Sequence, residues 1–147
     1  MNRTLSHYFV LVVMVVMLSC SDDDDDASRT DLLTARAWIA TKYEIGGAVA
    51  DVVECSADDV LAFSKEGKFT ITVGALACDD DEKDLQGTWS LKDNDQVLSM
   101  TIDGVTNEGT IVALTSTTFK LKTKSVLTED GEVIGVFDDL YVIYTAK

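Results

Sequence analysis

The chain has 147 residues, of which 26 are acidic and 12 are basic, so its formal net charge is −14. This length fits one domain with a modest core, and the negative charge makes nucleic acid and anionic lipid poor partners. Proline is absent, and the chain beyond its N-terminus is rich in Thr, Val, Asp and Gly, which suits strands and turns rather than disorder.

Residues 1–19 are expected to be a cleaved signal peptide. An unbroken apolar run of 11 residues extends from Tyr8 to Leu18. A membrane-spanning helix needs about 20 such residues, whereas the apolar part of a signal peptide needs about 7 to 15. The small residue Ser19 precedes Cys20 directly, which is the pattern that a lipoprotein signal peptidase recognises. We therefore expect Cys20 to be acylated, for example with palmitate, and to anchor the mature chain in outer-membrane lipid.

Residues 20–30 are expected to be the lipidated cysteine and a flexible acidic tether. After Cys20 come Ser21 and five aspartates, Asp22, Asp23, Asp24, Asp25 and Asp26. In a block of about five or six like charges the residues repel one another, and such a block stays disordered. The run also resembles the lipoprotein export signal of Bacteroidota-type Gram-negative bacteria, in which Ser and acidic residues after the lipidated Cys direct the protein to the cell surface. This resemblance implies a lipid-anchored protein of the outer membrane that faces the exterior.

Residues 31–147 are expected to form the folded domain. A short helical turn is predicted over residues 31–37. Apolar residues then recur at every second position, as in strands with one buried face, in eight segments: 38–45, 59–63, 68–73, 86–91, 96–102, 105–114, 118–125 and 136–145. Eight short strands joined by tight turns predict an all-β, antiparallel up-and-down barrel. A β-sandwich is the alternative, although it usually needs a long connection.

Three motifs occur in order along this domain: Leu32-Leu33-Thr34 before Trp38, Phe63-Ser64-Lys65-Glu66-Gly67-Lys68-Phe69-Thr70, and Gly87-Thr88-Trp89-Ser90-Leu91. Together they resemble the lipocalin-like domain of secreted Bacteroidota lipoproteins, over nearly the whole mature chain. That family commonly has a glycine between the Leu-Leu-Thr start and the first tryptophan, where this chain has Ala35. The resemblance implies a small calycin-type barrel and specifies no ligand.

Cys55 and Cys78 are predicted to form a disulfide. If Phe63 faces Lys68 across the turn between their strands, Cys55 faces residue 76, two positions from Cys78. The bridge would close a loop of about 24 residues and contribute about 3 kcal/mol. A metal site would need more ligands than two cysteines, and a redox pair usually has Cys-x-x-Cys spacing.

The sequence offers little for catalysis. Its one histidine, His7, lies in the predicted signal peptide, which excludes Ser-His-Asp and Cys-His chemistry in the mature chain. It contains no glycine-rich phosphate loop, and we predict no cofactor and no metal. The acidic stretch of residues 79–84 is interpreted as a solvated loop, with a weak calcium site as the alternative. An enzyme would have to work with carboxylates alone, so we predict a non-enzymatic protein.

The inward-facing residues of the barrel are the candidate lining of a cavity: Trp38, Phe69, Ile71, Trp89, Leu98, Met100, Phe119, Leu121 and Tyr141. Lys120, Lys122 and Lys124 alternate on the opposite face of their strand, where they would discourage aggregation or dock an acidic partner or glycan. The predicted function is binding of a small apolar ligand or glycan fragment. The alternative is an accessory scaffold that binds an outer-membrane protein without a small-molecule ligand.

Overall fold

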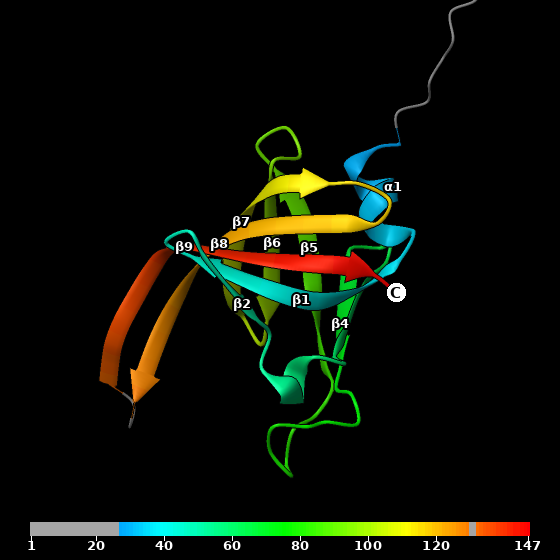
Figure 1. The fold of residues 1–147 in the computed structure, drawn as a ribbon. Helices are drawn as coiled ribbons and strands as arrows, with labels where there is room; N and C mark the ends of the chain where they lie inside the picture. The colour runs from blue at the N-terminus through cyan, green and yellow to red at the C-terminus, as the bar shows by residue number, and fades with distance from the viewer. Residues whose placement is uncertain (1–26, 130–131) are drawn as a thin grey trace, which may run out of the picture.

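The computed structural model describes residues 27–129 and 132–147. They form a closed barrel of eight antiparallel strands with one additional strand and one short α-helix (Figure 1). The predicted signal peptide, Cys20, Ser21 and the aspartates at positions 22–26 lie outside the described residues. None of the described helices is both long enough and apolar enough to cross a membrane.

The elements are, in chain order, α1 (Arg29–Thr34), β1 (Ala37–Ile45), β2 (Ala48–Asp51), the 3-10 helix η1 (Glu54–Ser56), β3 (Val60–Phe63), β4 (Lys68–Thr72), β5 (Leu85–Lys92), β6 (Val97–Ile102), β7 (Val105–Leu114), β8 (Thr118–Glu129) and β9 (Glu132–Ala146). Strands β3 to β9 pair in sequence order, and β1 pairs with both β3 and β9. The β1–β9 pairing closes the barrel. The predicted all-β barrel is confirmed, and a two-sheet sandwich is excluded because the described strands form a single closed sheet.

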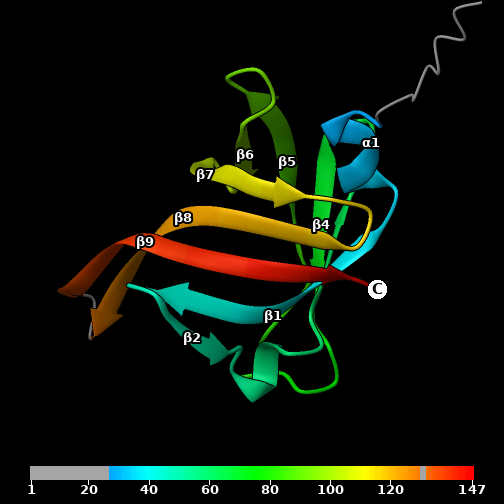
Figure 2. The same ribbon diagram turned by 45° about the horizontal axis from the view of Figure 1, so that its top comes forward.

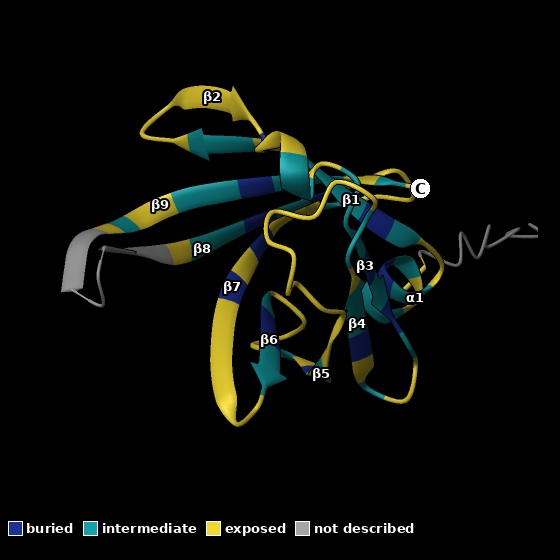
Figure 3. Cartoon of the chain, turned by 90° about the horizontal axis from the view of Figure 1, so that it is seen from below, coloured by how far each residue is buried: buried dark blue, intermediate teal, exposed yellow. Residues whose placement is uncertain are grey.

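All eight predicted strands are present, but the prediction missed β2. Every residue of β2 is exposed, so the strand lacks the buried alternation on which the prediction depended (Figure 3). It pairs with β1 across Gly46 and Gly47, whose φ angles of 57° and 85° favour glycine in a two-residue hairpin turn. The hairpin therefore extends β1 at one end of the barrel without taking part in its closure.

The helix begins two residues earlier than predicted and ends at Thr34, so that Ala37 already belongs to β1. Ser28 sets the start, because its hydroxyl accepts a hydrogen bond from the backbone N–H of Asp31 at 3.1 Å. Leu33 of this helix is fully buried and closes one end of the barrel, which we call the closed end. The indole Nε1 of Trp38 donates to the carbonyl of Leu33 at 3.0 Å.

The predicted register of the β3–β4 hairpin is wrong by one residue. Phe63 faces Phe69 rather than Lys68. Ser64 and Lys68 close the turn, with the N–H of Ser64 donating to the carbonyl of Lys68 at 2.8 Å. The loop thus has three residues and ends in Gly67 at φ 75°, a left-handed position that suits glycine. Because both phenylalanines now point inward, their rings pack 6.3 Å apart in the core.

A β-bulge in β1 changes which side chains face the barrel interior. Ala40 faces Tyr144 of β9, but Lys42 and Tyr43 then face Ile143 and Val142 because the register shifts between Ala40 and Lys42. If Thr41 were paired regularly, simple alternation from Ala40 would turn Lys42 inward. The bulge instead brings Tyr43 to the inner face and leaves Lys42 outside, where it pairs with Asp51.

The last two strands are longer than predicted. Strand β8 pairs with β7 only as far as Thr123, opposite Gly109, whereas its pairing with β9 continues to Glu129. The far ends of β8 and β9 therefore form a two-stranded hairpin that extends beyond the barrel wall (Figure 2). This part of β8 has no described strand on its β7 side.

The core fills the closed end. Its buried apolar side chains are Leu33, Trp38, Leu61, Phe63, Phe69, Trp89, Leu98, Ile111, Phe119 and Leu121. The rings of Trp38 and Phe119 meet edge to face at 5.7 Å, and those of Phe63 and Trp89 at 5.2 Å, both favourable geometries for aromatic pairs. The interior of this half is therefore packed with side chains.

Candidate ligand pocket

A pocket of about 230 Å³ lies inside the barrel, away from α1 and toward the end that carries η1. We call this the open end. Ten residues line the pocket: Trp38, Ala40, Tyr43, Val52, Ser56, Asp59, Leu61, Ile71, Met100 and Tyr144. They come from β1, the segment around η1, β3, β4, β6 and β9. A single interior space thus collects side chains from five of the barrel strands and from the rim.

The pocket walls are mainly apolar. Strand alternation places Leu61 of β3 opposite Ile71 of β4, and Met100 of β6 on the same inner surface. Trp38 forms the floor and has no exposed surface, whereas Ile71 and Met100 remain partly exposed. Side chains that point into a barrel and still retain exposed surface border a space that solvent reaches. Apolar walls of this kind favour an apolar ligand.

Two tyrosines contribute hydroxyl groups. The ring of Tyr144 stacks on Phe119, with centroids 5.1 Å apart and planes 16° apart. Burial raises the pKa of Tyr144 to about 12, and the nearby hydroxyl of Tyr43 adds to the increase. Because burial disfavours the phenolate, Tyr144 carries its proton at neutral pH. Its hydroxyl is then a neutral group that can donate or accept a hydrogen bond.

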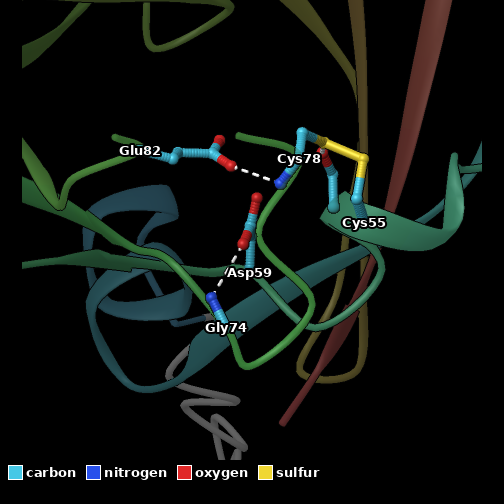
Figure 4. Close-up of a disulfide and its surroundings, with 6 residues drawn as sticks. Cys55, Asp59, Gly74, Cys78 and Glu82 are labelled. Carbon is cyan, nitrogen blue, oxygen red and sulfur yellow. Dashed lines mark hydrogen bonds between the residues drawn. A yellow bond between two sulfur atoms is a disulfide. The ribbon is translucent and has the colours of Figure 1, made fainter. Parts of the chain in front are cut away.

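Asp59 is the one charged residue that lines the pocket. It lies directly before β3 and shares the inner face of that strand with Leu61 and Phe63, both buried. One oxygen of its carboxylate accepts a hydrogen bond from the backbone N–H of Gly74 at 2.9 Å (Figure 4). This bond fixes the carboxylate at the pocket mouth.

The structure joins Cys55 and Cys78 in a disulfide, as predicted, with Cα atoms 4.8 Å apart. Cys55 lies in η1 next to Ser56, which lines the pocket. Cys78 lies in the loop of residues 73–84 between β4 and β5. The bridge therefore ties one side of the pocket rim to this loop (Figure 4).

Carboxylates near the disulfide hold the same loop through backbone N–H groups. Asp58 accepts from Ala75 at 2.7 Å, and Glu82 accepts from Cys78 at 2.7 Å. Asp84 accepts from the N–H of Val73 at 3.0 Å. The prediction of a merely solvated acidic loop missed these bonds, because no local pattern indicates them. Within residues 27–129 and 132–147, no group of three or more His, Cys, Asp or Glu side chains is placed to hold a metal.

The structure separates the predicted lining residues into three groups. Trp38, Ile71 and Met100 line the pocket. Five others belong to the packed core: Phe69, Trp89, Leu98, Phe119 and Leu121. Sequence reasoning missed the polar lining residues Tyr43, Ser56, Asp59 and Tyr144. The bulge at Thr41 hid Tyr43, and Ser56 lies outside the predicted strands. Asp59 begins the predicted strand 59–63, but a charged residue at a strand end indicates solvent exposure rather than a pocket lining.

The prediction for Tyr141 is wrong. Tyr141 faces Lys122 on β8 and Glu44 on β1, so its side chain lies on the outer face of the barrel. The Nζ of Lys120 is 4.6 Å from the centroid of its ring. Alternation along β9 turns the neighbouring Val142 and Tyr144 inward instead. Both faces of this strand carry apolar residues, which is why the sequence pattern did not distinguish them.

The three alternating lysines of β8 lie on this outer face and are paired with acids. Lys120 contacts Glu44 at 2.7 Å, and Lys124 contacts Asp138 at 3.0 Å. Lys122 contacts Asp139 at 2.5 Å, and this hydrogen bond raises the pKa of the lysine. The pairing neutralises much of the positive charge that a docking site for an acidic partner would need.

Two other hollows, of about 240 and 540 Å³, lie over β7 and β8. Their lining includes Glu108, Lys124 and Thr123. Glu108 and Lys124 are already paired with Lys92 and Asp138. The interior pocket is therefore the better candidate for an apolar ligand.

Comparison with known proteins agrees with the barrel. Residues 36–121 match the family described as the lipocalin-like domain. A lipocalin-like protein from Bacteroides uniformis ATCC 8492 has a similar structure, with a TM-score of 0.54 and 15% sequence identity over 79% of this chain and 99% of that one. An uncharacterized protein from Bacteroides eggerthii DSM 20697 has a TM-score of 0.49 and 14% identity over 76% of this chain and 98% of that one. No curated protein matches the sequence.

The fold is typical of binding domains rather than catalytic ones. The family match covers more than half of the chain and includes most strands of the barrel and every pocket-lining residue except Tyr144. The chain belongs to the family of lipocalin-like domains.

Proposed function

We propose that this protein is an outer-membrane lipoprotein, anchored through acylated Cys20 at the cell exterior, whose barrel binds a small apolar molecule or the apolar part of a glycan fragment. The observation that carries the proposal is the interior pocket of about 230 Å³ with Leu61, Ile71 and Met100 in its walls. A barrel filled with side chains along its whole length would offer no such space.

The size of the pocket limits its ligand. Pockets for drug-sized molecules measure roughly 300 to 1,000 Å³, so this one accommodates something smaller, such as a single ring with a short chain. Burial of apolar surface contributes about 25 cal/mol per Å². A ligand of this size buries little surface, and we expect dissociation constants in the micromolar range or weaker.

The proposed location depends on the N-terminal sequence. Cys20 follows a signal-like apolar run, and the acidic residues after it resemble a surface export signal. The tether before α1 reaches at most about 35 Å when extended. The chain as a whole has a net charge of −14 and no attraction for anionic lipid, so a covalent lipid is the more effective way to hold the domain at a membrane.

Mass spectrometry after solvent extraction tests the ligand-binding function. The full-length protein is isolated rapidly from the membranes of producing cells, and a small molecule is expected in the extract above the amount in a mock preparation, because a micromolar complex loses part of its ligand during isolation. Ala40→Leu fills part of the pocket and should abolish recovery, because Ala40 lines it. Ala113→Leu adds the same atoms at an exposed position of β7 and should leave recovery unchanged. Equal recovery from both variants would contradict the proposal.

One observation favours a second candidate, an accessory scaffold for an outer-membrane protein. Among the described strands, β8 pairs only with β9 beyond Thr123, so the projecting hairpin offers backbone groups of β8 to another strand. Cross-linking on intact cells would recover a protein neighbour if this function is correct. Replacing residues 126–135 with a short turn should remove that neighbour and leave small-molecule recovery intact.

A further inference from the structure

The charge around the pocket points to the chemical class of its ligand. We propose that the pocket selects small apolar amines in their protonated form, with the ammonium group at the carboxylate of Asp59 and the apolar body against Leu61, Ile71 and Met100. This inference rests on the proposed ligand-binding function and specifies its substrate class.

The position of Asp59 is the first argument. Its side chain belongs to the inner face of β3 and lines the pocket mouth. Of the described residues, only Gly74 is hydrogen bonded to its carboxylate, through one oxygen. The ion pairs among described residues use other acids: Asp31, Glu44, Asp51, Glu108, Asp138 and Asp139. The carboxylate at the mouth is therefore positioned to receive a cation from a ligand.

The composition of the lining is the second argument. None of the ten lining residues is basic, so an anionic ligand finds no partner in the pocket and meets Asp59 as a like charge. The tyrosine hydroxyls serve an amine or an alcohol equally well, because Tyr144 stays neutral. Discrimination between cation and anion thus falls to Asp59.

The loops at the open end are the third argument. Residues 51–59 contain four acidic residues and residues 74–84 contain five, nine in all, against the single basic residue Lys83. Hydrogen bonds and the disulfide hold both segments beside the pocket. Charges of one sign around a cleft raise the local concentration of the opposite ion and speed its capture. A small cation is therefore attracted to the mouth before it reaches Asp59.

Partial exposure keeps the proposed contact favourable. Asp59 and Ser56 are intermediate in exposure, so an ammonium bound at the mouth retains part of its hydration. A fully buried ion pair would lose more in desolvation. The apolar body enters the drier space toward Trp38, where it gains most from leaving water. The pocket thus has a polar mouth and an apolar floor, in the order that a short arylalkylamine requires.

Three probes of nearly equal size test the proposal: 2-phenylethylamine, 2-phenylethanol and 3-phenylpropanoate. Isothermal titration calorimetry of the full-length protein in an uncharged maltoside detergent measures each affinity, with heats from empty micelles subtracted. The amine should bind about tenfold more tightly than the alcohol, because a hydrogen bond to a charged group contributes more than a neutral one. The carboxylate should bind more weakly than the alcohol.

Asp59→Asn keeps an oxygen for the Gly74 bond while it removes the charge. The amine should then bind no more tightly than the alcohol, whose affinity should stay within about twofold of its original value. Asp93→Asn removes one negative charge from the exposed turn at the closed end and should change neither the affinity for the amine nor that for the alcohol. An amine that binds no better than the alcohol, or keeps its advantage in Asp59→Asn, overturns this inference alone. Failure of all three probes to bind overturns the proposed function as well.

Discussion

The indole nitrogen of Trp38 donates a hydrogen bond of 3.0 Å to the carbonyl of Leu33, and neither residue has exposed surface. Leu33 belongs to the only α-helix among the described residues, and Trp38 opens the first barrel strand. The bond fastens the helix over the closed end and holds the indole in place as the pocket floor. The depth of the pocket therefore depends on how firmly the helix is seated.

Leu33→Ala should lower the free energy of unfolding by about 2 to 5 kcal/mol, because it opens a cavity under the helix. Leu76→Ala, at a side chain that is 46% exposed, should lower it far less. Urea unfolding followed by circular dichroism measures both. Equal effects of the two variants would mean that the helix does not close the barrel in solution.

Gly87→Ala should destabilise the barrel more than the same substitution at a turn glycine such as Gly104. A Cβ at Gly87 would lie 2.3 Å from the carbonyl oxygen of Thr101 and 2.6 Å from Cε1 of Phe69. Gly104→Ala meets no atom within 4 Å and carries only the strain of its φ of 81°, about 1 kcal/mol. Thermal unfolding should rank Gly87→Ala as the less stable variant. The reverse order would contradict the packing described for β5.

Replacing Cys55 and Cys78 together with serine should lower the free energy of unfolding by about 3 kcal/mol in the chain-entropy account of a loop of this length. The disulfide is the covalent link between η1 and the loop of residues 73–84. Hydrogen exchange should also accelerate at Gly74 and Ala75. A reducing agent should weaken the parent protein and leave the double variant unchanged, and an equal response of both would count against the bridge.

Stability should fall in alkali because of Tyr144. Its folded-state pKa of about 12 lies above the ordinary value of 10.0, so its contribution is present below pH 10 and is lost as the pH rises toward 12. The loss amounts to about 2 to 3 kcal/mol. Urea unfolding between pH 8 and 12 should therefore show a steeper decline in the parent than in Tyr144→Phe. If the parent and Tyr144→Phe showed the same dependence of unfolding free energy on pH, the hydroxyl of Tyr144 would be exposed to solvent in the folded protein, which contradicts its burial.

The proposed location at the outer face of the outer membrane can be tested by substitution at the N-terminus. Cys20→Ala should prevent acylation and release the protein from the membrane fraction, and palmitate labelling should disappear. Replacing the five aspartates at positions 22–26 with asparagine should retain acylation but reduce accessibility to protease on intact cells. Unchanged surface exposure in the second variant would show that these acids are only a tether.

Strand alternation was sufficient to predict the barrel. Apolar residues recur at every second position along its strands, and those on the inner face, such as Phe69 in β4 and Leu98 in β6, are buried. Prediction from alternation failed where one extra residue exchanges the inward-facing and outward-facing positions. The bulge at Thr41 brought Tyr43 inside, and the three-residue turn ending at Gly67 shifted β3 against β4. Asp59 was missed because its role depends on Gly74, which lies 15 positions away along the chain. Contacts of that kind leave no local pattern.

Met100 offers the most direct test of the central claim, that the barrel interior binds a small apolar ligand. The sequence has four methionines, of which Met1, Met14 and Met17 lie in the predicted signal peptide, so the mature chain should give one methionine methyl signal by carbon-13 NMR. Met100 lines the pocket. Titration with 2-phenylethanol should shift this signal to saturation in the parent protein and leave it unmoved in Ala40→Leu. A signal that does not shift in the parent, or shifts equally in both proteins, would contradict the account.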